Sequence, residues 1–114
     1  MIGGICLDTC HAFASGYDLS TERGLSEFTV EIESCVGIDA VKLIHLNDSR
    51  KGCGSRIDRH EHIGRGLIGK EGLRKLVNHP AFSSIPLILE TPKKNEMDDP
   101  ANLEIVRSFI EAAE

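Results

Sequence analysis

The chain has 114 residues, of which 40% are hydrophobic and 27% are charged, and its formal net charge is −5. These values are typical of one small soluble globular domain. Its apolar runs are shorter than the ~20 residues of a membrane span, and its first residues lack the basic region and cleavage-like site of a signal peptide. The acidic balance also argues against nucleic-acid binding by bulk charge alone.

Apolar runs and turn residues predict that strands and helices alternate along the chain. Strands are expected over residues 2–8, 40–46 and 85–90. Helices are expected over residues 27–36, 70–78 and 98–113, the first with Ser26 as its N-cap and Gly37 after its last residue. Residues 9–24 are expected to form a loop. Residues 47–68 are expected to form a second loop, whose length predicts a functional role.

This order predicts an α/β fold with right-handed βαβ units and a parallel sheet. Each predicted strand ends in a residue that can bind a metal ion, namely Asp8, His45 or Glu90. Active sites of α/β barrels lie at the C-terminal ends of the strands. Three βα units cannot close a barrel and leave both sheet edges open. We therefore interpret residues 1–114 as the C-terminal part of a larger (β/α)8 (TIM) barrel, with further sequence expected upstream.

The candidate metal site consists of carboxylate and imidazole side chains at the strand ends and in the long loop: Asp8, His11, His45, Asp58, His60 and Glu90. Carboxylate with imidazole suits Zn²⁺, Mn²⁺ or Fe²⁺ rather than Ca²⁺. Basic residues lie among these ligands and could form an anion-facing surface on an acidic protein: Arg50, Lys51, Arg56, Arg59 and Arg65. The alternative is that these charges only keep a long loop soluble.

The four cysteines are Cys6, Cys10, Cys35 and Cys53, and none of them forms a C-x-x-C pair. Reduced thiols in the cytoplasm are expected in the absence of a secretory signal. Cys6 alternates with Asp8 along a predicted strand, so we interpret Cys6 as a small core residue rather than a ligand.

Four segments of the sequence resemble endonuclease IV, the family-2 apurinic/apyrimidinic endonucleases. The segments are LDTCH followed by FASGYD within residues 7–18, HLNDSR at 45–50, GSRIDRHEHIG at 54–64 and LILETP at 87–92. The resemblance extends over the whole chain, and the second and third segments are the most specific. The sequence differs from the family at Arg65, where an acidic residue is usual.

The resemblance implies a (β/α)8 barrel that holds three zinc ions and cuts double-stranded DNA 5′ to abasic sites, leaving a 3′-hydroxyl. It implies that His11, Asp58 and His60 hold one zinc. It assigns Asp8, His45 and Glu90 to a second zinc at the catalytic centre, and Arg59, Asn47 and Ser49 to the DNA-binding residues. The family takes further ligands, two histidines and a bridging glutamate, from its N-terminal half.

Two other hypotheses remain open at this stage. The first is a metal-dependent sugar isomerase or epimerase of the xylose isomerase-like barrels, which share the architecture and the ligand types. The second is a chain that binds metal and catalyses nothing. We expect the isolated chain to be inactive, because its metal cluster is incomplete. A complementing N-terminal half, or self-association through the open sheet edges, could complete it.

Overall fold

The computed structural model describes residues 4–90, 92 and 98–113. The strands are β1 (Ile5–Asp8), β2 (Val41–His45), β3 (Asp48–Ser49), β4 (His60–Glu61) and β5 (Leu87–Ile88). The helices are α1 (Thr9–Ser15), α2 (Glu22–Cys35), α3 (Gly69–Asn78) and α4 (Asp98–Ala113), with a short 3-10 turn η1 at Ile38–Ala40. Among the described residues, no helix combines the length and the apolar character that crossing a membrane requires.

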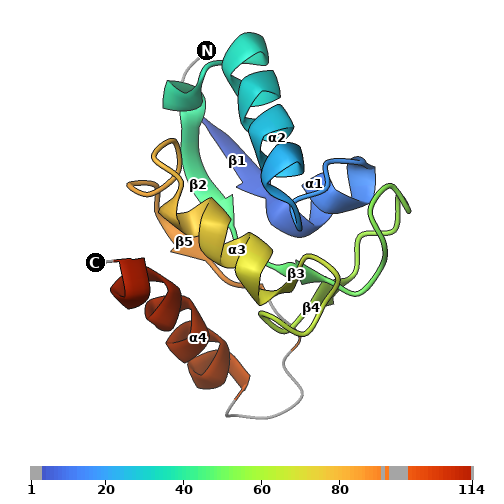
Figure 1. The fold of residues 1–114 in the computed structure, drawn as a ribbon, viewed down its shortest axis with the longest axis vertical. Coiled ribbons are helices and arrows are strands. Elements are labelled where there is room, and N and C mark those ends of the chain that lie inside the picture. The colour runs from blue at the N-terminus through green and yellow to red at the C-terminus, as the bar shows by residue number, and fades with distance from the viewer. Residues whose placement is uncertain (1–3, 91, 93–97, 114) are drawn as a thin grey trace.

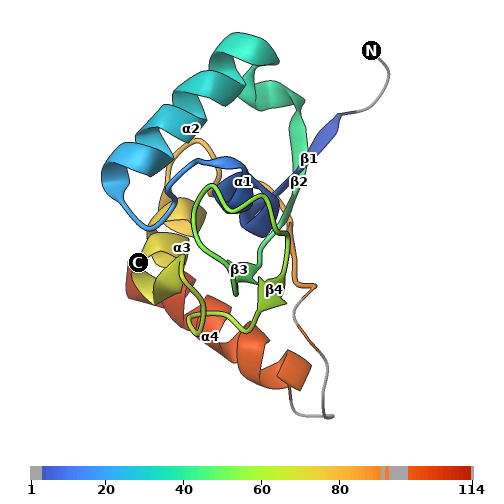
Figure 2. The same ribbon diagram turned by 90° about the vertical axis from the view of Figure 1, so that its right-hand side faces the viewer.

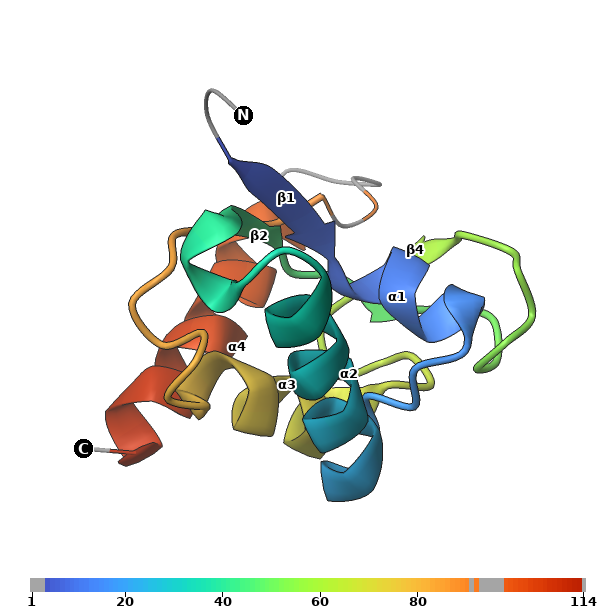
Figure 3. The same ribbon diagram turned by 90° about the horizontal axis from the view of Figure 1, so that it is seen from above.

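Strands β1, β2 and β5 form a parallel sheet in that order, so the predicted parallel α/β arrangement is confirmed. Helices α2 and α3 lie on one side of this sheet, and α4 packs beside α3 (Figure 1, Figure 3). The core fills the space between these layers and includes Phe28, Ile44, Leu73, Phe82 and Phe109. Each of these side chains is at most 6% exposed, as expected where apolar area drives folding.

The opposite face of the sheet is not covered by the described residues. In the sheet register, Cys6 pairs with Leu43 and His45 pairs with Ile88. Since Leu43 and His45 are two residues apart in β2, all four side chains lie on the same face of the sheet. Cys6 is exposed and Ile88 is 44% exposed. The interpretation of Cys6 as a core residue is therefore wrong for this structure, because no described element packs against its side of the sheet.

The segment between β1 and the middle of α2 is more helical than the sequence-based expectation. Residues 9–15 form α1 rather than a loop, because the Asp8 side chain caps the helix by accepting a hydrogen bond from the His11 N–H at 3.1 Å. Helix α2 begins at Glu22 with Thr21 as its N-cap, five residues before the expected N-cap Ser26. Gly24 was expected to end a loop but lies inside α2, where an added Cβ would come 1.9 Å from the Asp18 carbonyl oxygen.

The long loop is organised around one buried carboxylate. Its two short strands, β3 and β4, pair in antiparallel fashion (Figure 2). Asp48 is fully buried, and its Oδ1 accepts hydrogen bonds from the N–H groups of Ser49, Ile68 and Gly69 at 2.8–3.2 Å. Its Oδ2 accepts from the N–H groups of Gly64 and Gly66, both at 3.0 Å. A carboxylate in this position satisfies backbone donors that a loop would otherwise leave unpaired.

Helix α4 is hydrogen-bonded to the same loop. Asn102 is 2% exposed, and its Oδ1 accepts a hydrogen bond from the Ile63 N–H at 2.8 Å. Its Nδ2 lies 3.0 Å from His62 Nδ1. The loop between β4 and α3 is therefore anchored both to Asp48 and to the last helix.

We expect Asp48→Asn to lower the free energy of unfolding by at least about 2 kcal/mol, since hydrogen bonds to a buried charged group contribute more than neutral ones. The amide would also turn a donor toward backbone donors. Urea unfolding followed by circular dichroism measures the change. Asp39→Asn, at an exposed aspartate, is the matched control, and an equal effect in both variants would contradict the role given to Asp48.

Candidate metal centre

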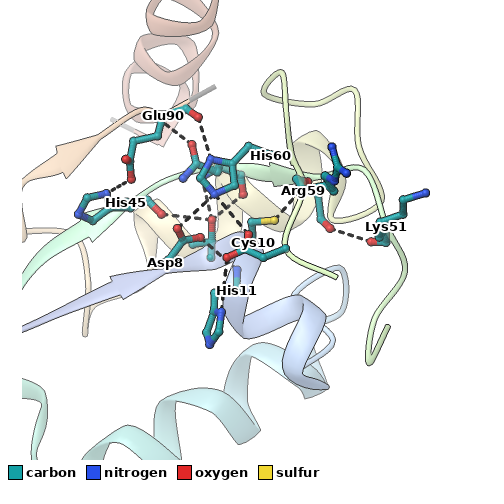
Figure 4. A network of polar contacts seen from close by, with 12 residues as sticks. Asp8, Cys10, His11, His45, Lys51, Arg59, His60 and Glu90 are labelled. Carbon is teal, nitrogen blue, oxygen red and sulfur yellow. Dashed lines mark hydrogen bonds and ion pairs between the residues drawn. The ribbon is translucent and has the colours of Figure 1, made fainter. Parts of the chain in front are cut away.

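All six residues predicted to bind metal lie at the C-terminal ends of the sheet strands or in the segments that follow them. Asp8 ends β1 and His45 ends β2, while Glu90 follows β5 by two residues. His11 belongs to α1, Asp58 to the long loop and His60 to β4. Figure 4 shows His60 beside Asp8, and the Glu90 carboxylate directed toward His45.

The distances between donor atoms match those of ligands around a shared cation. His11 Nδ1 lies 3.5 Å from Asp58 Oδ2, and His60 Nε2 lies 3.4 Å from Asp58 Oδ1 and 3.3 Å from Asp8 Oδ2. Two ligand atoms at about 2.0–2.2 Å from one tetrahedral zinc lie about 3.3–3.6 Å apart. Each of these pairs therefore has the donor chemistry and the spacing of two ligands that share a zinc-type ion.

The ring of His60 is oriented by a backbone carbonyl. Its Nδ1 lies 2.8 Å from the Glu90 carbonyl oxygen, which can only accept a hydrogen bond, so Nδ1 carries the proton. Nε2 is then the ring nitrogen left to bind a metal ion, and it is the atom that faces Asp8 and Asp58. This is the arrangement by which proteins fix the tautomer of a metal-binding histidine.

His45 pairs directly with the Glu90 side chain through its Nδ1. Glu90 thus contacts His45 by its carboxylate and His60 by its carbonyl group. The structure brings the two predicted ligand groups into one continuous cluster, because Asp8 and Glu90 both lie beside His60.

The strand ends are held together by Thr9 and Asn47, of which Thr9 was not singled out from the sequence. The Thr9 hydroxyl donates to the Asn47 carbonyl oxygen at 2.6 Å and accepts from the Asn47 N–H at 2.8 Å. Asn47 Oδ1 accepts from the Glu90 N–H at 2.8 Å. These three bonds tie the ends of β1, β2 and β5 to one another. The only signal for Thr9 in the sequence is its place between Asp8 and His11.

Asn47 and Ser49 are fully buried. The Ser49 hydroxyl donates to the Lys51 carbonyl oxygen at 2.7 Å, and the Asn47 side chain holds Glu90. Their contacts with this chain are therefore those of residues that position the site.

Cys10 lies inside the cluster and was also missed as a candidate. Its thiol is fully buried and donates to the Arg59 carbonyl oxygen at 3.3 Å. Burial, followed by the nearby Asp58 carboxylate, raises the pKa of this thiol to about 12. Because Arg59 lies between Asp58 and His60, this bond fixes the peptide that carries both ligands.

An open cleft of about 440 Å³ adjoins the ligands and is lined by Arg50, Asp58, Arg59, His60 and Pro92. Arg59 is exposed, whereas Arg50 is paired with Glu61 at 3.4 Å. The Arg59 carbonyl oxygen also accepts from the Arg50 N–H at 2.9 Å. The cleft thus combines a positively charged wall with the metal ligands, which suits an anionic substrate.

Residues 3–112 match the xylose isomerase-like TIM barrel family, so the chain belongs to this family. Its relatives include proteins named probable endonuclease 4. The protein from Aquifex aeolicus is 51% identical over 108 residues, covering 95% of this chain and 38% of that protein. The protein from Chloroflexus aurantiacus strain J-10-fl is 51% identical over 112 residues, covering 97% of this chain and 39% of that protein.

The crystal structure of endonuclease IV from Thermus thermophilus matches with a TM-score of 0.84 at 41% identity, covering 96% of this chain and 39% of that chain. The chain therefore spans about two fifths of the length of these relatives. The predicted partial TIM barrel and the resemblance to endonuclease IV are confirmed.

We expect Thr9→Val to lower the free energy of unfolding by about 1–3 kcal/mol, because it leaves two buried backbone groups of Asn47 unpaired at nearly constant volume. Urea unfolding measures this change. Thr29→Val is the control, since the Thr29 hydroxyl donates only to the Leu25 carbonyl oxygen of its own helix. A Thr9→Val variant as stable as Thr29→Val would contradict the role of Thr9.

Proposed function

We propose that this chain is the C-terminal part of a zinc-dependent DNA-repair endonuclease that hydrolyses the phosphodiester bond 5′ to abasic sites and leaves a 3′-hydroxyl. The observation that carries the proposal is the close pairing of Asp58 with His11 and His60, and of His60 with Asp8, at distances that suit ligands of shared cations. The relatives named endonuclease 4 support the nuclease reaction over sugar isomerisation. The four free cysteines fit a reducing cytoplasmic location.

In this proposal His11, Asp58 and His60 hold one zinc ion, and Asp8, His45 and Glu90 hold a second. Zinc bound there would supply Lewis-acid chemistry, lowering the pKa of water toward about 7 and offsetting the negative charge of the phosphodiester. A third ion would take its ligands from the rest of the barrel. The paired contacts of His60 and His45 with Glu90 support the view that both ions belong to one centre.

The protein residues bind and orient the substrate around this centre. Arg59 lines the cleft beside Asp58 and His60, so we assign it a contact with a DNA phosphate. Asn47 and Ser49 are buried, and we assign them the positioning of Glu90 and of the basic loop rather than a contact with DNA. Glu90, Asp8 and His45 are assigned to the catalytic centre as ligands.

The uncovered face of the sheet suits packing against a partner. Strands β1 and β5 are the two edges of the sheet, and Cys6 and Ile88 are exposed on its free face. We propose that the remaining units of the barrel, from a complementing N-terminal half, cover this face and complete the metal cluster. Self-association through the sheet edges is the second candidate.

A complementation assay tests the function. We expect the purified chain with zinc not to nick a duplex that carries one abasic analogue. Addition of the N-terminal residues of the Aquifex aeolicus relative is expected to restore cleavage on the 5′ side.

In this assembly Asp58→Asn should lower kcat/KM at least about 100-fold, because a charge-stabilising ligand is lost. Asp39→Asn, at an exposed aspartate, should have no effect.

Each alternative gives a different result in the same assay. Nicking by the chain alone would contradict the expected inactivity, and a dimer in size-exclusion chromatography would then point to self-association. An assembly that converts a ketose but leaves the abasic duplex intact would contradict the nuclease and favour the sugar isomerase.

A second prediction concerns Arg59. We expect Arg59→Ala to weaken binding of the complemented assembly to the abasic duplex and to reduce the slope of log K against log salt by about one, as for loss of one phosphate contact. Fluorescence anisotropy at several salt concentrations measures both quantities. Arg23→Ala removes an exposed arginine on α2 that pairs with Glu27. A slope for Arg59→Ala equal to that of Arg23→Ala would contradict the phosphate contact.

A further inference from the structure

The buried thiol of Cys10 is a donor that the proposed zinc ligation does not use. Its Sγ and one ligand atom each of Asp58 and His60 all lie within 4.8 Å of one another. Cys10 comes from α1, whereas Asp58 and His60 lie two residues apart in the long loop and in β4, so the group joins two segments distant in the sequence. Figure 4 shows the Cys10 sulfur directed toward the segment that carries Arg59 and His60.

The set differs in chemistry from the other donors of the cluster. Among the residues that the structure describes, Cys10, Asp58 and His60 form the one group of three or more possible ligands whose atoms all lie within 4.8 Å of one another. This group contains a sulfur atom. Thiolate ligands select soft, thiophilic metal ions, whereas carboxylate and imidazole alone serve harder ones. A thiolate and an imidazole on one tetrahedral zinc lie about 3.6 Å apart, so a movement of roughly one ångström would bring the three atoms to bonding positions.

Two of the three donors border the open cleft, on which the third, Cys10, does not open. Cys10 itself is fully buried, but the side chains of Asp58 and His60 are 42% and 24% exposed and line the open cleft. The Cys10 thiol donates to the Arg59 carbonyl oxygen at 3.3 Å, and the Asp58 and Ser49 side chains also interact with it. That bond is a weak one, and a metal–sulfur bond would replace it.

We propose that Cys10, Asp58 and His60 form a thiolate-carboxylate-imidazole site that captures a soft divalent cation such as Cd²⁺ and competes with the zinc ligation of the same loop. On binding, the S–H bond of Cys10 breaks, a sulfur–metal bond forms, and the proton passes to the buffer. Asp58 and His60 are then withdrawn from His11 and Asp8. The proposal rests on the proposed function only in that it uses the same two metal ligands.

The test is a Cd²⁺ titration of the chain in which the three exposed cysteines are replaced, namely Cys6→Ser, Cys35→Ser and Cys53→Ser. The absorbance band of sulfur-to-cadmium charge transfer is expected to saturate at one ion per chain. Cys10→Ser in this background should abolish the band. Asp58→Asn and His60→Gln should each raise the Kd of Cd²⁺ at least tenfold, while Asp39→Asn leaves it within twofold.

The proposal is overturned if the band persists in Cys10→Ser, if Cd²⁺ binds without the band, or if Asp58→Asn and His60→Gln leave the Kd unchanged. Should Cys10→Ser fail to fold by circular dichroism, cadmium nuclear magnetic resonance of the background variant reports sulfur ligation without any change at Cys10. A zinc titration by calorimetry separates the two proposals. If zinc binds but the cadmium–sulfur signal is absent, only the Cys10 site is contradicted. If the chain binds neither zinc nor cadmium, both the Cys10 site and the proposed zinc ligation are contradicted.

Discussion

The carboxylate of Asp48 is the interaction on which the site depends. It is buried in β3, shortly after the end of β2, and accepts hydrogen bonds from five backbone N–H groups, four of them between residues 64 and 69. The same segment approaches so closely that a Cβ on Gly66 would lie 2.5 Å from Asp48 Oδ1. One charged group thus replaces the regular backbone pairing that an irregular loop cannot provide for itself.

With the loop held by Asp48, its opposite strand can present Asp58 and His60 to the sheet. The peptide between them is held by the carbonyl oxygen of Arg59, which accepts from the Arg50 N–H and the Cys10 thiol. Thr9 and Asn47 hold the strand ends that carry Asp8 and Glu90. Three carboxylates and three imidazoles therefore meet at one edge of the sheet, where a cation would offset the repulsion among the carboxylates.

Several parts of this arrangement were predictable because they depend on local sequence. An apolar run that stops at Asp8 or His45 indicates both a buried strand and its last residue, and parallel strands bring those residues to one edge. Helix α1 was missed because its only start signal, Asp8, was also a ligand candidate. The early start of α2 was missed because Gly24 is typical of a helix breaker, whereas it is accommodated by close contact with Asp18. The role of Asp48 depends on donors 16 to 21 residues away, which no local pattern indicates.

The sequence by itself determined the order of strands and helices, the identity of the six candidate ligands and the resemblance to endonuclease IV. It could do so because periodicity, strand ends and motif spacing are properties of neighbouring residues. The tertiary structure decided that His60 presents Nε2 to Asp8 and Asp58, that Asn47 and Ser49 are buried supports, that Cys6 is exposed and that Cys10 lies among the ligands. These outcomes depend on which segments pack against one another across tens of residues, and on the sheet face that the described part of the chain leaves uncovered.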